Sequence, residues 1–140
     1  QSNAKQLVEQ AAEVYSEFPD SSFKLCLEAE KLNDEKVVID ICGCKAKYYL
    51  LFTDYENAEI EITNGINLSK KNNDYNNLSY FYSLKSIQLE RIGEIDQSHY
   101  VLLESYKISK EHGSPAQQHP GERASAQVER VRVRSRCSRS

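Results

Sequence analysis

Cysteine is the residue type in this 140-residue chain best suited to metal or redox chemistry, and it occurs four times. Cys42 and Cys44 lie two positions apart. Side chains at that spacing on a helix point about 200° apart, so these two thiols would not coordinate the same metal ion. No second cysteine pair and no nearby histidine completes a site, and Cys137 lies in an atypical tail. The sequence therefore predicts reduced thiols at all four positions, with no disulfide between Cys42 and Cys44 and no metal at either.

Other catalytic constellations are missing from the sequence. The histidines, His99, His112 and His119, have no serine, cysteine or carboxylate partner at a motif spacing, and the five glycines are isolated rather than gathered in a phosphate-binding loop. Paired acids such as Glu59 and Glu61 are typical of a solvated helix face. We therefore expect a protein that is not an enzyme and has no cofactor. An enzyme with an unrecognised site is the least favoured alternative.

Composition narrows the class of partner. Hydrophobic residues make up 39% of the chain and charged residues 28%, with few glycines and prolines, which favours a soluble helical domain. No apolar run approaches the ~20 residues that a membrane-spanning helix needs. Residues 1–113 carry 12 basic and 19 acidic side chains. An acidic body argues against nucleic-acid binding, because that function normally requires clustered lysine and arginine.

Both ends of the chain differ from its body. Residues 1–4 include Ser-Asn-Ala, which is typical of a purification-tag remnant. From Ser114 onward the chain lacks Lys, Asn, Ile, Tyr, Leu and Phe and contains Ala, Pro, Gly and Arg instead, with six arginines. This switch from AT-rich to GC-rich codon types predicts that residues 114–140 are a non-native basic tail. A natural basic tail is the alternative.

The central feature of the sequence is an internal repeat of 40 residues. Residues 34–73 align with residues 74–113 without a gap. The copies share four identities: Asp34/Asp74, Lys45/Lys85, Ser69/Ser109 and Lys70/Lys110. Apolar residues recur at pairs such as Ile41/Phe81, Ile62/Leu102 and Ile66/Tyr106. Small residues recur at Ala46/Ser86, Ala58/Ser98 and Gly65/Ser105.

Each copy predicts two helices, because its apolar residues recur at helical spacing on either side of a break. Thr53 and Glu56 fit a capping box at the start of the second helix of the first copy. Asn33-Asp34 and Asn73-Asp74 supply helix stop and N-cap signals. Residues 5–33 read as a similar half-repeat. Its first helix carries an apolar stripe that ends with Phe18, before Pro19, and Asp20-Ser21-Ser22 caps the second.

Residues 53–58 (Thr-Asp-Tyr-Glu-Asn-Ala) and 93–98 (Gly-Glu-Ile-Asp-Gln-Ser) resemble the inter-helix turn of the tetratricopeptide repeat family. The small residues listed above match the family positions at which helices cross closely. Three features depart from the pattern: the period is 40 rather than 34, Lys70 and Lys110 replace the usual closing proline, and Lys45 and Lys85 replace leucine. The resemblance implies an all-α fold in which antiparallel helix hairpins stack as a short right-handed α-solenoid over residues 5–113, with a half-repeat 5–33 and repeats 34–73 and 74–113.

The resemblance also implies a function. The long repeat is similar to the variant in bacterial peptide-pheromone receptors and in sensory segments ahead of cyclase or regulator domains. It predicts a cytoplasmic protein- or peptide-binding module, the sensory or scaffolding part of a larger bacterial regulator. A pheromone receptor domain is the alternative. The first helices of such repeats line a concave groove, which nominates five partner-binding residues: Asp40, Lys47, Tyr80, Ile87 and Glu90.

The last predicted helix has nothing natural after it to cover Leu102 and Tyr106. Because solenoid ends expose an apolar face unless a cap covers it, the sequence predicts homodimer formation through the exposed end helices. The alternative is a folded-back tail that contacts this face through Ala124, Val128 and Val131.

Overall fold

A computed structural model describes residues 3–112 of the chain, and these residues are almost entirely helical. The elements are α1 (Asn3–Val14), α2 (Pro19–Lys31), a single 3-10 turn η1 (Glu35–Val37), α3 (Val38–Leu51), α4 (Tyr55–Lys71), α5 (Tyr75–Arg91) and α6 (Ile95–His112). No strand occurs among the described residues, which confirms the predicted all-α class.

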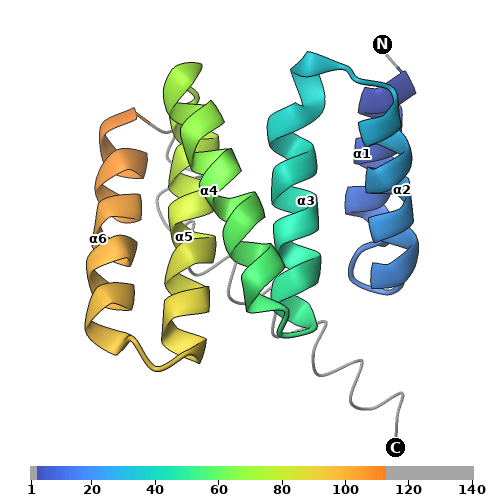
Figure 1. Cartoon of the computed structure of the whole chain (residues 1–140). Helices are drawn as coiled ribbons and strands as arrows, with labels where there is room; N and C mark the ends of the chain where they lie inside the picture. Colours follow the sequence, from blue (N-terminus) through green and yellow to red (C-terminus); the bar gives the residue numbers. More distant parts are fainter. Residues whose placement is uncertain (1–2, 113–140) are drawn as a thin grey trace, which may run out of the picture.

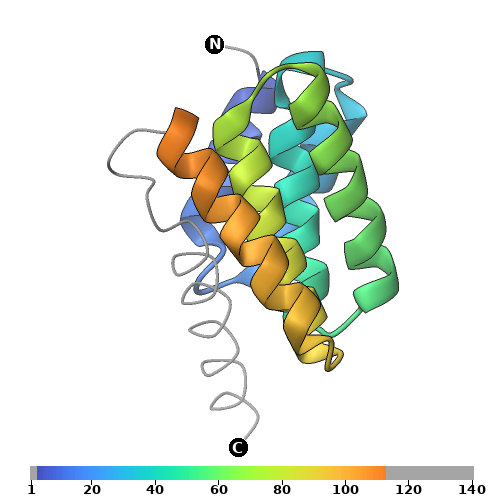
Figure 2. The same cartoon turned by 90° about the vertical axis from the view of Figure 1, so that its left-hand side faces the viewer.

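The helices are arranged in their chain order. α1 and α2 lie at one end of the molecule and α6 at the other, and successive helices run in opposite directions (Figure 1). α1 packs against α2, α3 against α4 and α5 against α6, while α2 also contacts α3 and α4 contacts α5. A view toward the α6 end shows α6 in front, with α5, α4 and α3 behind it (Figure 2). α3 and α4 thus lie within residues 34–73, and α5 and α6 lie beyond residue 73.

The 40-residue repeat is visible in the backbone of the turns. Within residues 3–112, four residues have a positive φ, and they fall into two pairs 40 positions apart: Asn33 with Asn73 (φ 51° and 53°) and Thr53 with Gly93 (φ 58° and 91°). Asparagine and glycine tolerate this left-handed conformation, whereas a β-branched threonine is strained in it. The turns are therefore fixed by local backbone geometry as well as by helix packing.

The predicted capping box is wrong by one residue. Asp54, and not Thr53, is the N-cap of α4, and its carboxylate accepts a hydrogen bond of 3.2 Å from the backbone N–H of Asn57. Asp74 caps α5 in the same way through Asn77. Thr53 cannot cap α4 because it occupies the left-handed position that ends the preceding helix.

The start of α2 also differs from the prediction. The N-cap position is Phe18, which makes no side-chain cap bond, and Pro19 begins the helix. Ser22 is not a cap; its hydroxyl donates to the Ala11 carbonyl at 2.7 Å and ties α2 to α1. Because α1 ends at Val14, Phe18 is 59% exposed, and Tyr15 (1% exposed) is buried in its place.

Small residues sit where helices approach most closely. All six predicted small positions are buried: Ala46, Ala58, Gly65, Ser86, Ser98 and Ser105. A Cβ added to Gly65 would lie 2.3 Å from the ring of Phe81 in α5. Phe81 belongs to the main hydrophobic core, which joins α3, α4 and α5.

The α5–α6 contact is built differently, from serine hydroxyls. Ser86 and Ser98 lie with their hydroxyl oxygens 2.9 Å apart, and each can donate to the other's carbonyl. Ser79 and Ser105 repeat this arrangement with 3.1 Å between the hydroxyls. Hydrogen bonding of these buried hydroxyls removes the penalty of taking them out of water.

At the other end, Ala4 lies in α1 and is buried in a cluster with Ala29, Val37 and Ile41. Ala124, Val128 and Val131, the predicted tail contacts, lie outside the described residues, as do Cys137 and His119.

Candidate functional site

A pocket of about 170 Å³ opens between α1, α3 and α5, the first helices of the three hairpins. α3 supplies residues one and two turns apart on a single face, so that their side chains line one wall. The lining residues are Val8, Ala12, Ile39, Asp40, Gly43, Cys44, Lys47, Asn77 and Tyr80.

The structure brings three of the five predicted groove residues to this pocket: Asp40, Lys47 and Tyr80. Ile87 lies two helical turns further along α5 and is only 7% exposed, because it packs in the main core. Glu90 is exposed near the end of α5. The five predicted groove residues therefore do not form one surface. Three line the pocket, Ile87 is in the core, and Glu90 is exposed further along α5.

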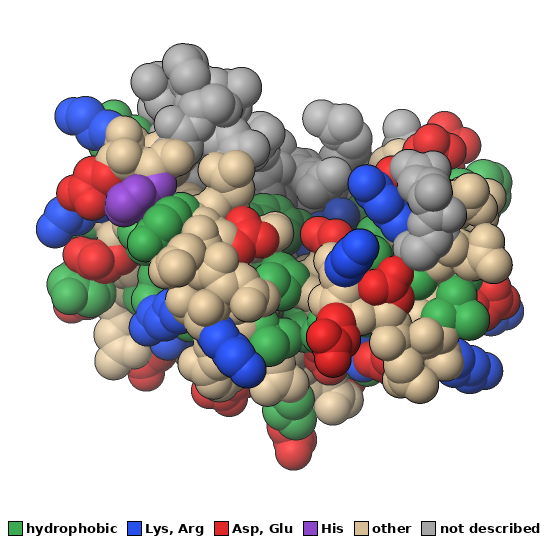
Figure 3. Space-filling view, turned by 90° about the horizontal axis from the view of Figure 1, so that it is seen from above, with side chains coloured by type: hydrophobic (Ala, Val, Ile, Leu, Met, Phe, Trp, Pro, Cys, Tyr) green, Lys and Arg blue, Asp and Glu red, His purple; other side chains and the backbone are tan. Residues whose placement is uncertain are grey.

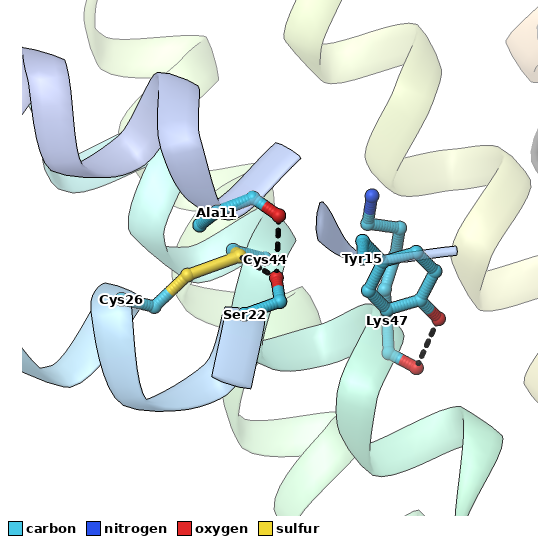
Figure 4. Close-up of a disulfide and its surroundings, with 6 residues drawn as sticks. All are labelled: Ala11, Tyr15, Ser22, Cys26, Cys44 and Lys47. Atoms are coloured by element: carbon cyan, nitrogen blue, oxygen red, sulfur yellow. Dashed lines mark hydrogen bonds between the residues drawn. A yellow bond between two sulfur atoms is a disulfide. The ribbon is translucent and has the colours of Figure 1, made fainter. Parts of the chain in front are cut away.

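Lys47 is an unusual lining residue because its side chain is only 9% exposed. Its ammonium nitrogen lies 4.2 Å from the centroid of the Tyr15 ring, and the Tyr15 hydroxyl donates to the Lys47 carbonyl at 3.4 Å (Figure 4). Burial lowers the pKa of Lys47 to about 8. Among the described residues, no carboxylate forms an ion pair with Lys47. The aromatic face of Tyr15 partly replaces the water that the buried Lys47 ammonium has lost.

An acid and an apolar contact complete the same wall. The pKa of Asp40 is raised, first by burial of its carboxyl and then by the negative charge of Asp74, although Lys5 opposes the shift. Gly43, between Asp40 and Lys47, allows close approach of Tyr80, whose ring would lie 3.4 Å from a Cβ at that position. The pocket thus combines an acid, an amine and a phenol with aliphatic surface, a composition suited to recognition.

The prediction of reduced cysteines is wrong for two of the four. Cys26 of α2 and Cys44 of α3 form a disulfide, and Cys44 also lines the pocket (Figure 4). The spacing of Cys42 and Cys44 carries no information about this pairing, which depends on how α2 packs against α3. Cys42 is free and buried, as predicted, and burial raises its thiol pKa to about 12, with further contributions from Glu61.

Lys45, which recurs as Lys85 in the second copy of the repeat, has a structural role that the sequence did not reveal. Its ammonium lies 3.0 Å from a carboxylate oxygen of Glu30 and 3.2 Å from one of Glu61. The pair with Glu61 is the better shielded, since both side chains are 13% exposed. Lys45 thereby connects α3 to both α2 and α4 behind the pocket.

Val8, Ala12 and Asn77 line the pocket but were not predicted. The signal in α1 was weak because residues 5–33 align only loosely with the repeat. Within residues 3–112, no group of three His, Cys, Asp or Glu side chains is placed to hold a metal ion.

Comparison with known protein families, curated proteins and solved structures yields no match. None of the described helices combines the length and apolar character needed to cross a bilayer.

The buried amine makes stability depend on pH. The pKa of Lys47 is about 8 in the folded protein and ~10.4 in the unfolded chain, which therefore binds the proton more tightly. Hence Lys47 favours folding increasingly as pH rises from 8 toward 10, by about 2 kcal/mol between pH 7 and 9.5. We expect Lys47→Met to be more stable than wild type at pH 7 and this advantage to shrink by pH 9.5.

Denaturant titrations at both pH values measure this difference. Because the variant retains Tyr15 and Cys42, the contributions of those groups largely cancel in the comparison. A difference in unfolding free energy that did not change with pH would contradict the assignment.

Proposed function

We propose that this chain is a protein- or peptide-binding helical-repeat module, the sensory or scaffolding part of a larger bacterial regulator. In this proposal its hairpins stack as a short right-handed solenoid of the tetratricopeptide kind. The supporting observation is the pocket itself, which is lined by the first helix of each hairpin and contains three residues nominated from the repeat. A stacked array uses such a surface to hold a partner segment.

The lining suggests how a segment would be held. Val8, Ala12 and Ile39 offer aliphatic surface to one apolar side chain of the partner. Lys47, Asn77 and Tyr80 offer polar atoms that fix its orientation, as in other sites that recognise helices or extended peptides. Since the pocket holds only about 170 Å³, it accommodates one medium-sized side chain rather than a whole ligand. We expect micromolar affinity or weaker from this surface alone.

The experiment compares peptide-library selection on wild type with selection on Tyr80→Ala and Lys47→Met. We expect selected peptides to lose about tenfold or more in affinity for both variants. Ile60→Ala is the matched control, because Ile60 is 53% exposed on α4, a helix that does not line the pocket. Circular dichroism establishes that each variant is folded. Identical peptides and affinities for wild type and the two pocket variants would exclude this pocket as the binding site.

The cytoplasmic location expected from the sequence has one observation against it. A disulfide between Cys26 and Cys44 is typical of an oxidising compartment, and cytosolic disulfides are rare. Differential alkylation of these two cysteines in intact cells decides between the compartments. If the two cysteines are reduced and become alkylated, the result supports a cytoplasmic location. If the disulfide protects them from alkylation, the result excludes that location.

A further inference from the structure

The two cysteines of the Cys26–Cys44 disulfide differ in their exposure. Cys26 of α2 is 0% exposed, whereas Cys44 of α3 is partly exposed and is one of the residues that line the pocket. The lining residues come from α1, α3 and α5, so the pocket reaches this disulfide at Cys44 and not at the helix that carries Cys26.

The α2 side of the same bond is closed by packing. Ser22 of α2 is 0% exposed, and its hydroxyl oxygen lies 3.9 Å from the sulfur of Cys44 (Figure 4). This hydroxyl donates to the Ala11 carbonyl at 2.7 Å, which holds α1 against α2 beside the disulfide. A small molecule in solution therefore meets Cys44 by way of the pocket, whereas contact with Cys26 requires that α2 move away from its neighbours.

This asymmetry decides which sulfur an external thiol attacks, because thiol–disulfide exchange depends on access to the attacked sulfur. A thiolate that enters the pocket forms a new S–S bond to Cys44 Sγ. The bond to Cys26 breaks, and Cys26 Sγ leaves with the electron pair and takes up the proton that the incoming thiol released. The incoming thiol is oxidised and Cys26 is reduced, so no further reagent is needed. The step is reversible, since the Cys26 thiol can attack the mixed disulfide in turn.

The charged residues beside Cys44 indicate which class of thiol the pocket suits. Asp40 stands four residues before Cys44 and Lys47 three residues after it, and both line the pocket. Residues at these spacings share one face of a helix, so Cys44 lies between an acid and an amine. A thiol that carries both an ammonium and a carboxylate, as cysteine does, can place one beside each group. A pocket of about 170 Å³ is large enough for an adduct of that size.

We propose that Cys44 is a thiol-modification site, at which a small thiol of the cysteine type forms a mixed disulfide inside the pocket and releases Cys26. The exchange is independent of the partner binding proposed for the same pocket. Figure 3, which views the end of the molecule at which α6 terminates, shows acidic, basic and hydrophobic side chains interspersed. No large single-sign region on that face selects among charged thiols, so the selectivity falls to Asp40 and Lys47.

Cys42 takes no part in this exchange. It is 6% exposed and is not among the lining residues. Burial raises its thiol pKa to about 12, which leaves little of the nucleophilic thiolate at neutral pH. Cys42 therefore serves as an internal control in every experiment on the other two cysteines.

A matched pair of variants tests the asymmetry. Cys26→Ala leaves Cys44 as a free thiol, and Cys44→Ala leaves Cys26. Both are made in the full chain with Cys137→Ser, so that the cysteine outside the described residues does not react. After incubation with cystine, peptide mass spectrometry is expected to show Cys44 modified at least tenfold faster than Cys26. Cys42 is expected to stay unmodified in both, and circular dichroism establishes that each variant is folded.

The native disulfide is tested in the full chain that carries Cys137→Ser alone, so this measurement does not depend on the folding of a variant at Cys26 or Cys44. L-cysteine is added, the exchange is stopped with acid, and the adduct is located by peptide mass spectrometry. The adduct is expected on Cys44, with Cys26 as a free thiol. An adduct on Cys26, no adduct on Cys44, or equal rates in the matched pair would overturn the proposal.

The class of thiol is tested with reagents of different charge. In Cys26→Ala, cystine is expected to modify Cys44 about threefold faster than the uncharged disulfide of 2-mercaptoethanol does, after each rate is divided by that for an unstructured cysteine peptide. Adding Asp40→Asn and Lys47→Met is expected to remove this preference. Equal rates for the two reagents in Cys26→Ala, or a preference that survives both added substitutions, would overturn the assignment to a cysteine-type thiol.

Discussion

Replacing Gly65 by alanine is expected to destabilise the protein by about 2 kcal/mol, although alanine is the better helix former. The added Cβ would lie 2.3 Å from two ring atoms of Phe81, and Phe81 is fully buried in the core of α3, α4 and α5. A ring in that position cannot move aside, so α4 and α5 must separate. Denaturant unfolding followed by circular dichroism measures the loss.

Gly43→Ala is the matched control, because its nearest neighbour is a Tyr80 ring atom at the ordinary contact distance of 3.4 Å. This substitution is expected to be neutral or to stabilise by up to ~1 kcal/mol through helix propensity. Adding Phe81→Leu to Gly65→Ala should recover part of the lost stability, since the clash is removed. Equal stability of Gly65→Ala and wild type would contradict the close α4–α5 crossing.

Loss of the Cys26–Cys44 disulfide is expected to cost about 3 kcal/mol. The bond closes a loop with a sequence separation of 18 and adds a cross-link to the backbone connection between α2 and α3. Without it the unfolded chain gains conformational freedom. The α1–α2 hairpin supplies Val8 and Ala12 to the pocket, so its wall should also loosen. Urea titrations with and without reductant measure the effect.

The double variant Cys26→Ser, Cys44→Ser should be less stable than oxidised wild type, both with and without reductant. Its unfolding midpoint should not change when reductant is added. Cys42→Ala serves as the control, because this thiol is free and its variant should keep the reductant-sensitive step. A wild-type midpoint that did not move on reduction would contradict the role given to the bond.

The sequence predicted the helical class and the tight crossings because these depend on periodicity. The equivalence of Gly65 and Ser105 follows from the 40-residue repeat, and so does the recurrence of Asn33 and Asn73 at helix ends. Thr53 and Asp54 were harder to distinguish, since both are good N-cap residues. The choice between them depends on which one takes the left-handed conformation after α3.

The site was predictable where one helix alone determines it. Asp40 and Lys47 share a face of α3 by spacing, but the burial of Lys47 depends on Tyr15, which α1 contributes from a distant part of the chain. Ile87 shows the limit of the same reasoning, because a residue on the correct face still enters the core when it lies too far along the axis. The pairing of Cys26 with Cys44 likewise required the placement of α2 on α3.

The serine pairs between α5 and α6 should make this helix contact less sensitive to cooling than the apolar contacts of the core. Apolar contacts such as Phe81 on Gly65 weaken on cooling, because the hydrophobic driving force falls and carries a large heat-capacity change. The contacts of Ser79 with Ser105 and of Ser86 with Ser98 consist of hydrogen bonds and expose little apolar surface when they open. On cooling toward freezing, the protection factors of amides at the α4–α5 junction should therefore fall first, while the amides between α5 and α6 stay protected.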